Sequence, residues 1–191
     1  MARNKEFDEQ EVLSKAMEVF WKQGYEKTSL QDLVDHMGIH RRSIYDTFGD
    51  KRALFIKALM HYEETITKRI QKKVESKIKV KQAIRDVFDV IIYPDDQNPR
   101  GCLTVNAAVE LSLLDSDVSK KVTEMFDKTE TLFYDLIRHG QETGEISTTI
   151  DAKGYAHFIH NSLVGLRVIA KTTEDQKKMK SIVDVTLSTL D

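Results

Sequence analysis

Apolar residues recur along most of the chain at the three- and four-residue spacing of amphipathic helices. Near the start Val12, Ala16 and Val19 share one face, and near the end Met179 and Val183 begin another. No convincing run alternates apolar and polar residues with the period of two that is typical of a strand. The pattern therefore predicts an all-α fold of about nine helices. Their expected positions are residues 8–23, 29–36, 40–47, 51–76, 79–92, 101–114, 116–142, 151–171 and 174–190.

Glycine and proline mark the breaks between these helices. Most of the eight glycines fall between periodic runs, where helix ends belong, and both prolines, Pro94 and Pro99, lie in one short segment. The first three expected helices are short, and most of those that follow are longer. This order predicts a compact N-terminal head over residues 1–50 and a larger helical bundle over residues 51–191.

Composition narrows the class of protein. The 191 residues are 40% hydrophobic and 31% charged, which is typical of a globular chain. The single cysteine, Cys102, rules out an internal disulfide framework. The N-terminal MARNKEFDEQ lacks the apolar core of a signal peptide, and no stretch has the length and apolarity of a membrane span. We therefore expect a cytoplasmic protein with no membrane partner.

The most informative stretch runs from Thr28 to Phe55. Thr28 or Ser29 can cap a short helix, and Gly38 can supply the tight turn that follows it. The next helix, from about residue 40, buries Ile44 on one face and begins with basic and hydroxyl residues. Two short helices around a glycine turn predict a helix-turn-helix, whose second helix enters the major groove of DNA. The net charge of −2 counts mildly against DNA binding but does not exclude it, because the distribution of charge matters more than its sum.

This stretch resembles the DNA-binding head of the TetR family of repressors. The matching residues are Phe20, Gly24, Thr28, Leu33, Gly38, Ile39, Ser43, Ile44, Tyr45, Phe48, Lys51, Leu54 and Phe55. Two later segments, RGCLTVNAAVEL from Arg100 and GLRVIAKT from Gly165, resemble the sixth and eighth helices of the family. The resemblance implies a homodimeric repressor that binds a pseudo-palindromic double-stranded operator and is released by a small-molecule inducer of unknown identity. It also implies that residues 1–50 bind DNA and that residues 51–191 bind the ligand and dimerise.

The resemblance implies which residues contact DNA. Base and phosphate contacts fall at Arg41, Arg42, Ser43, Tyr45, Thr47, Lys51 and Thr28. Arg42 stands where glycine or proline is frequent, and Asp46 places a carboxylate near phosphates. We consider two explanations for Asp46: an i, i+4 ion pair with Arg42, or a bond from a cytosine amine.

The resemblance also implies a ligand pocket in the bundle and a signal that passes through the sixth helix. The candidates for ligand or redox sensing are Cys102, Tyr93, Asn106, Phe126 and Phe133. Cys102 is expected at the N-terminus of the sixth helix, where unpaired N–H groups and Arg100 favour a thiolate. An oxidant or electrophile that modifies it would then release DNA. The alternative is an inert cysteine packed near the loop, with an ordinary noncovalent inducer in the adjacent pocket.

Dimerisation is expected to pair the last two helices with their copies. The predicted interface residues are Leu163, Gly165, Leu166, Ile169, Ile182, Val183 and Leu187. The alternative is that these side chains only cover the chain's own core.

No enzyme, cofactor or metal is expected. Phosphate-binding glycine loops, nucleophile elbows and zinc-protease motifs are all missing from the sequence. His157 and His160 have a spacing that metal ligands can have, but no third ligand accompanies them. The rival to a repressor is a helical adaptor or scaffold whose head has lost DNA binding, which only Asp46 and the acidic balance favour.

Overall fold

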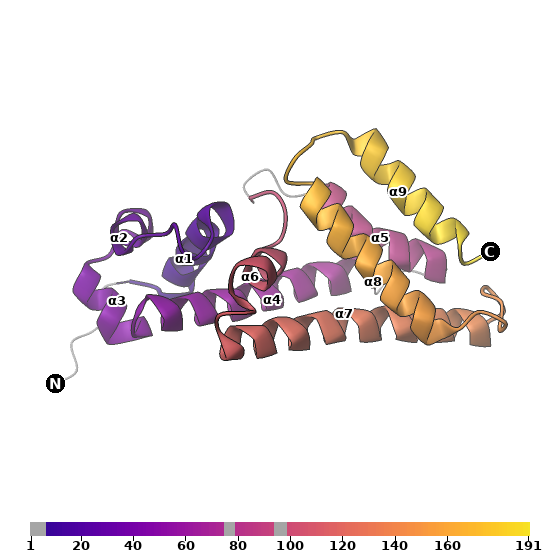
Figure 1. Ribbon diagram of the computed structural model, residues 1–191, viewed down its shortest axis with the longest axis horizontal. Coiled ribbons are helices and arrows are strands. Elements are labelled where there is room, and N and C mark those ends of the chain that lie inside the picture. Colours follow the sequence, from indigo (N-terminus) through magenta and orange to yellow (C-terminus); the bar gives the residue numbers. More distant parts are fainter. Residues whose placement is uncertain (1–6, 75–78, 94–98) are drawn as a thin grey trace.

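A computed structural model describes residues 7–74, 79–93 and 99–191, and within these residues every regular element is an α-helix (Figure 1). Three short or medium helices form the head, α4 leads out of it, and the remaining helices build the body. Their bounds are α1 Glu9–Gln23, α2 Leu30–Met37, α3 Arg41–Phe48, α4 Lys51–Val74, α5 Val80–Ile92, α6 Leu103–Leu111, α7 Ser116–Glu142, α8 Ala152–Ile169 and α9 Gln176–Ser188.

The prediction of an all-α fold with about nine helices is confirmed over the described residues. Each helix end lies within three residues of its expected position, apart from the end expected at residue 76, which lies outside the described residues, as does Pro94. The largest shift is in α6, which ends at Leu111 because the amides of Leu114 and Asp115 fold back onto the Leu111 carbonyl. The proposed division after residue 50 stays a prediction.

Capping side chains explain several of these starts. Asp8 accepts a bond from the amide of Gln10 at the start of α1. Ser29 and Asp32 form a reciprocal capping box at the start of α2, so Ser29 is the cap rather than Thr28. Asp115 caps α7 in the same way as Asp8 caps α1. Each cap supplies an acceptor for amides that the helix leaves unpaired.

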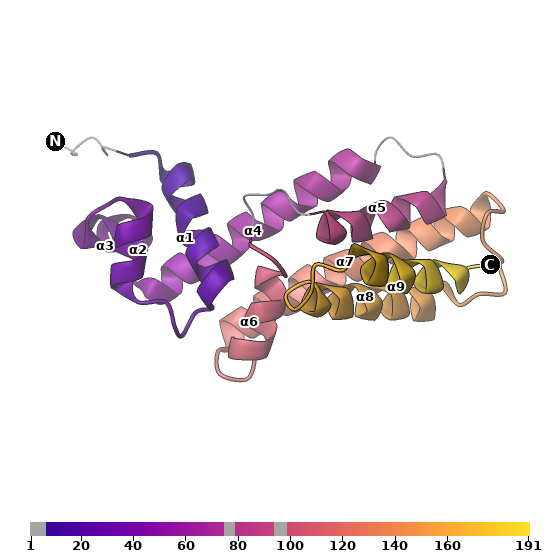
Figure 2. The same cartoon turned by 90° about the horizontal axis from the view of Figure 1, so that it is seen from above.

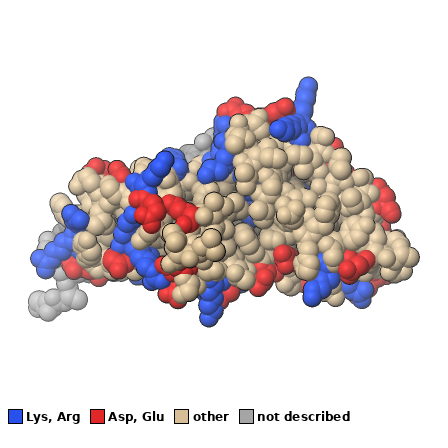
Figure 3. Space-filling model, viewed as in Figure 1, with Lys and Arg blue, Asp and Glu red and all other residues tan. Residues whose placement is uncertain are grey.

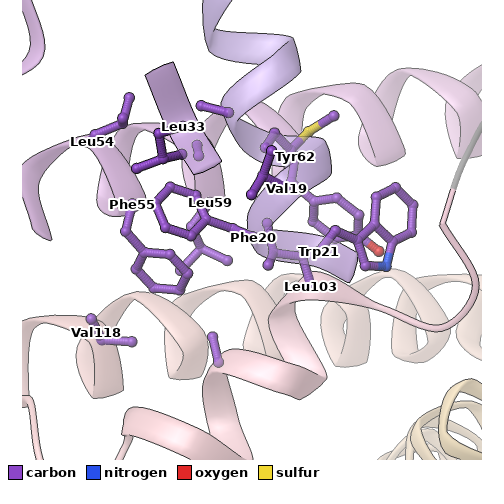
Figure 4. Close-up of a cluster of buried hydrophobic side chains, with 14 of the residues drawn as sticks. Val19, Phe20, Trp21, Leu33, Leu54, Phe55, Leu59, Tyr62, Leu103 and Val118 are labelled. Atoms are coloured by element: carbon purple, nitrogen blue, oxygen red, sulfur yellow. The ribbon is translucent and has the colours of Figure 1, made fainter. Parts of the chain in front are cut away.

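One apolar cluster holds the head to the rest of the molecule (Figure 4). The rings of Phe20 on α1 and Phe55 on α4 meet edge to face, with centroids 5.1 Å apart. Trp21 meets Tyr62 in the same way at 4.8 Å. Leu103 of α6 and Val118 of α7 belong to the same cluster. The head therefore shares its core with α6 and the start of α7.

A second apolar cluster fills the body between α5, α7, α8 and α9. Phe88 and Phe133 stack in it with centroids 6.2 Å apart, and both are fully buried. Seen from above, α8 and α9 lie side by side along one flank, while α4 runs from the head into the body (Figure 2). Ile70, near the end of α4, joins this second cluster. A single helix thus contributes to both cores.

Arg52, at the start of α4, ties the head to the beginning of α7. Its guanidinium donates to both carboxylate oxygens of Asp115, at 2.6 and 2.8 Å, and to Asp117 at 2.7 Å. These bonds from Arg52 lower the pKa of Asp115 to about 2. The pair is partly exposed and screened by solvent, so we expect its contribution to stability to be small.

We predict that Arg52→Met makes the stability of the protein less dependent on acidic pH. The pKa of Asp115 is depressed in the folded state, so the contribution of the pair is present above the usual value of 3.8 and is lost as the pH falls towards about 2. Urea unfolding at about pH 5 and about pH 2 should show a smaller difference in the variant. Lys120→Met, an exposed change on α7, is the control. An equal difference in the variant and the parent would contradict the assignment.

Candidate DNA-binding surface and ligand cavity

The turn between α2 and α3 depends on Gly38. This residue has φ 71°, in the left-handed region that glycine adopts without strain, and its amide donates to the Val34 carbonyl at 3.0 Å. Leu33 before the turn and Ile44 after it are fully buried. The turn therefore holds α3 at the outer end of the head, with one face against the core.

The opposite face of α3 is open to solvent. Arg41 and Arg42 are exposed, Tyr45 is 45% exposed, and Ser43 and Thr47 are half-buried. These five residues lie where the sequence predicted a DNA-reading face, and the structure brings them together on one helix. Basic side chains are visible at this end of the molecule in Figure 3. Contact with DNA itself stays a prediction for each of them.

The N-terminus of α3 is left uncapped. His40 occupies the cap position without a side-chain hydrogen bond, and the first turn holds no acidic residue. The α1, α2 and α7 helices, in contrast, begin with a carboxylate or hydroxyl that accepts from their amides. Unpaired amides at a helix N-terminus attract anions, so α3 presents both amides and guanidinium groups to a phosphate backbone.

The two arginines of α3 have different surroundings. Arg42 Nε lies 3.5 Å from Asp46 Oδ2, which is the i, i+4 pair that the sequence suggested. Both side chains are well exposed, so the pair is weak and screened. Arg41 makes no ion pair or hydrogen bond with any residue that the structure describes. Its five donors are therefore available to a base edge.

Two residues predicted to contact DNA have surroundings that the sequence did not predict. The Thr28 side chain is 1% exposed and donates to the Gly24 carbonyl at 2.6 Å, so it stabilises the turn before α2 and offers little surface to a phosphate. Lys51 does open α4, but its ammonium lies 4.3 Å from the centre of the Tyr25 ring. Asp50 caps α4 by accepting from the Ala53 amide. A phosphate bound at the N-terminus of α4 would lie next to the Asp50 carboxylate and would compete with it for the helix amides.

A cavity of about 410 Å³ opens between α4, α6, α7 and α8. Phe126 lines it, as predicted for a pocket residue. Phe133 does not, because it is buried in the second core against Phe88. Tyr93 does not either, because its ring is 40% exposed and lies beneath the ammonium of Lys180. The amphipathic pattern could not separate core aromatics from pocket aromatics.

Cys102 occupies the position before α6 that the sequence predicted, but its side chain is 1% exposed and forms no cap bond. It lies beside Tyr62, whose pKa is raised first by burial and next by Cys102. This burial favours the packed, inert interpretation over a reactive thiol. A reagent in solution would need local opening to reach the sulfur.

Polar contacts connect α6 to the head. The Glu110 carboxylate accepts from the amides of Tyr25 at 2.9 Å and Glu26 at 2.8 Å. Asn106, predicted as a sensing residue, instead donates to the Trp21 carbonyl at 3.2 Å and accepts from Lys171 at 2.9 Å. It bridges α1 and the end of α8 and does not line the cavity. Sequence reasoning missed Glu110, since a lone glutamate carries no signal for partners 84 and 85 residues away.

Comparison with known proteins identifies the family to which this architecture belongs. The family description "Bacterial regulatory proteins, tetR family" matches residues 12–58, and "Tetracyclin repressor-like, C-terminal domain" matches residues 79–185. The chain belongs to the TetR family. The resemblance found in the sequence is thereby confirmed.

Relatives within the TetR family are similar along the whole chain. The HTH-type transcriptional regulator YezE of Bacillus subtilis (strain 168) is 38% identical over 194 residues and covers 100% of both chains. The HTH-type transcriptional repressor ComR of Escherichia coli (strain K12) is 29% identical and covers 97% of this chain and 90% of its own. A cysteine mutant of the TetR family regulator CifR, complexed with 26-base-pair operator DNA, matches with a TM-score of 0.90 and 28% identity over 100% of both chains.

The predicted dimer residues of this TetR-family chain divide into two groups. Four of them, Leu163, Leu166, Val183 and Leu187, are buried in the chain's own second core, so a partner cannot reach them. Ile169 and Ile182 are half-buried, and Gly165 is exposed with open space where a side chain would stand. The exposed apolar residues nearby are others, namely Phe158, Val168 and Val185.

The two histidines of α8 gather around one carboxylate. His160 is 5% exposed, and its Nδ1 lies 2.9 Å from Glu130 Oε1. Burial lowers the pKa of His160. His157 is exposed and lies 3.8 Å from the other oxygen. Over the described residues no group of three or more ligating side chains could hold a metal, and no helix there is long and apolar enough to cross a membrane.

We predict that Glu110→Ala lowers the free energy of unfolding by about 1–3 kcal/mol, because two amides of the head lose their acceptor. Chemical denaturation measures the change. Glu64→Ala, an exposed glutamate on α4, is the matched control and should change stability by less than about 0.5 kcal/mol. Equal effects of the two substitutions would show that the Glu110 contacts do not secure the head.

Proposed function

We propose that this protein is a sequence-specific transcriptional repressor that acts as a homodimer in the cytoplasm and binds a pseudo-palindromic operator. The observation that carries the proposal is the exposed face of α3, where Arg41 has no partner among the described residues and no side chain caps the helix N-terminus. The overall match to a regulator bound to operator DNA supports it. Each recognition helix would enter the major groove of one half-site.

The adaptor alternative loses its main support. It rested on the carboxylate of Asp46 near DNA, and this carboxylate pairs with Arg42 on the same helix. A carboxylate beside a guanidinium on the same helix repels a phosphate backbone less than an isolated one would. The proposal assigns no catalytic role, and the curated relatives described above carry names of regulators rather than of enzymes.

The dimer surface that we propose lies on α8 and α9. Phe158 is 45% exposed, Val168 48% and Val185 65%. The surface over α8 and its surroundings carries few charged side chains in the view of Figure 3. Gly165 lies on the same exposed face and leaves room for a partner helix to approach closely. Covering such apolar side chains is what stabilises a dimer.

The inducer site that we propose is the cavity of about 410 Å³. Thr104 of α6 lines it, and Glu110 on the same helix holds the head. A ligand that displaces α6 would therefore act on the turn between α1 and α2. A second route, through modification of Cys102, stays a prediction and would require the buried sulfur to become accessible.

We predict that Arg41→Ala weakens operator binding by about 1–3 kcal/mol and relaxes base preference, because it removes a base-edge contact. Lys51→Ala should weaken operator and scrambled DNA alike and lower the salt dependence of binding. Fluorescence anisotropy with the gene's upstream DNA at several salt concentrations measures both effects. Arg138→Ala, on α7 far from the head, is the control. Operator binding that is unchanged in both variants would refute the assignment of the DNA-binding surface.

We predict that Val168→Asp separates the dimer into folded monomers, because the new carboxylate would be desolvated at the interface. Sedimentation at micromolar concentration measures the association state, and circular dichroism confirms folding. Leu113→Asp, which places the same group on a fully exposed loop residue, should leave the dimer intact. A Val168→Asp variant that sediments as the parent dimer would exclude this face as the interface.

A further inference from the structure

A buried arginine lacks a counter-charge among the described residues. The Arg167 side chain on α8 is only 7% exposed. Across residues 7–74, 79–93 and 99–191, no carboxylate lies within ion-pairing distance of its guanidinium, and no hydrogen bond joins it to another residue. A buried charge without a partner is costly, and proteins normally pair it. A guanidinium on a cavity wall, without a partner among the described residues, can bind an anion that enters the cavity.

The position of Arg167 identifies where that partner would lie. Arg167 lines the cavity of about 410 Å³ and also a smaller one of about 310 Å³, and Tyr62 and Ile66 stand with it between the two. Since Tyr62 belongs to α4 and Arg167 to α8, the Arg167 side chain lies where these two helices line the same cavities. Water in the cavities can solvate the guanidinium while the site is empty.

The rest of the larger cavity is suited to an apolar body. Ile66, Ile70, Met125, Phe126 and Leu132 line its walls. The one acidic side chain among its described lining residues, Glu63, is already paired with Lys128 at 2.6 Å. An anion that enters therefore meets one unpaired positive charge and no unpaired negative charge among the described lining residues. Guanidinium and carboxylate form strong paired hydrogen bonds, which become stronger when water is excluded.

We infer that the inducer is a small carboxylic acid with an apolar body, whose carboxylate binds Arg167 and whose body fills the cavity of about 410 Å³. This inference rests on the proposed function, since it names the ligand class of the proposed inducer site. It adds a specific requirement: the ligand must carry a negative charge at one end.

The chain contains its own reporter for binding. Trp21 is the single tryptophan, it contacts Tyr62, and it lines the smaller cavity next to Arg167. Its Nε1 atom is buried without a hydrogen-bond partner among the described residues. Ligand binding at Arg167 should therefore change tryptophan fluorescence even when DNA is absent.

The experiment compares acids with their uncharged primary amides. Hexanoate, octanoate, decanoate and 4-phenylbutyrate are each titrated against the corresponding amide into the full-length protein, with Trp21 fluorescence and thermal unfolding as readouts. We expect at least one acid to bind about tenfold or more tightly than its amide. The amide carries no negative charge, and its NH2 group cannot accept the second hydrogen bond from the guanidinium. If no acid in the panel binds more tightly than its amide, the inference is overturned.

Variants of Arg167 assign the preference to this residue. Arg167→Gln should abolish the preference for the acid, Arg167→Lys should retain part of it, and Arg138→Gln, which removes the same charge elsewhere, should retain all of it. If circular dichroism shows that Arg167→Gln does not fold, Arg167→Lys is used instead. A weaker preference for the acid in Arg167→Lys than in the parent would then support the inference. A full preference in the Arg167 variant that folds would overturn the inference.

Operator binding is measured separately, so the two proposals fail in different ways. Release of operator by the preferred acid, and its absence in Arg167→Gln, would support both proposals. Binding of the acid through Arg167 without release would support the anion site and count against induction from this cavity. Failure of the parent to bind any operator would refute the proposed function and leave the fluorescence result standing.

Discussion

The structure depends on α4, one face of which is buried at intervals from Leu54 to Ile70. Its first half packs against α1 through Phe55 and Phe20, and its end reaches the second core through Ile70. Burying one large aromatic or aliphatic side chain contributes about 1.5–3 kcal/mol, and the buried side chains of the head share one cluster with those of α4, α6 and α7. The head therefore cannot change its position without repacking the residues around α4.

Directional polar contacts accompany this apolar packing between the head and the body. Arg52 binds the start of α7, Glu110 holds the turn after α1, and Asn106 joins α1 to the end of α8. Glu110 and Asn106 belong to α6 itself, and Arg52 binds the start of the helix that follows α6. Since hydrogen bonds tolerate little displacement, a small movement of α6 changes these contacts before it disturbs the cores.

Sequence periodicity predicted the helices well because each helix buries a regular stripe, and caps such as Asp8 and Ser29 lie next to those stripes. The i, i+4 pair of Arg42 and Asp46 was also predictable, since it depends only on local geometry. The residues of the dimer interface were not predictable in this way. Leu163 and Val183 are as apolar as a dimer contact would be, but periodicity cannot say whether a residue's own chain or a partner covers it. Glu110 and Arg167 were missed for a related reason, because their significance lies in residues distant in sequence.

The carboxylates of Asp46 and Asp50 have a consequence for how the protein searches DNA. They lie on and beside the helix that carries Arg41 and Arg42, and each reduces the positive charge that this surface presents to phosphates. Fewer neutralised phosphates mean fewer counterions released, so random DNA is held more weakly and the salt dependence is shallower. Contacts to base edges are not weakened in the same proportion. We therefore expect a higher ratio of operator affinity to background affinity, which matters in a genome where non-specific sites far outnumber operators.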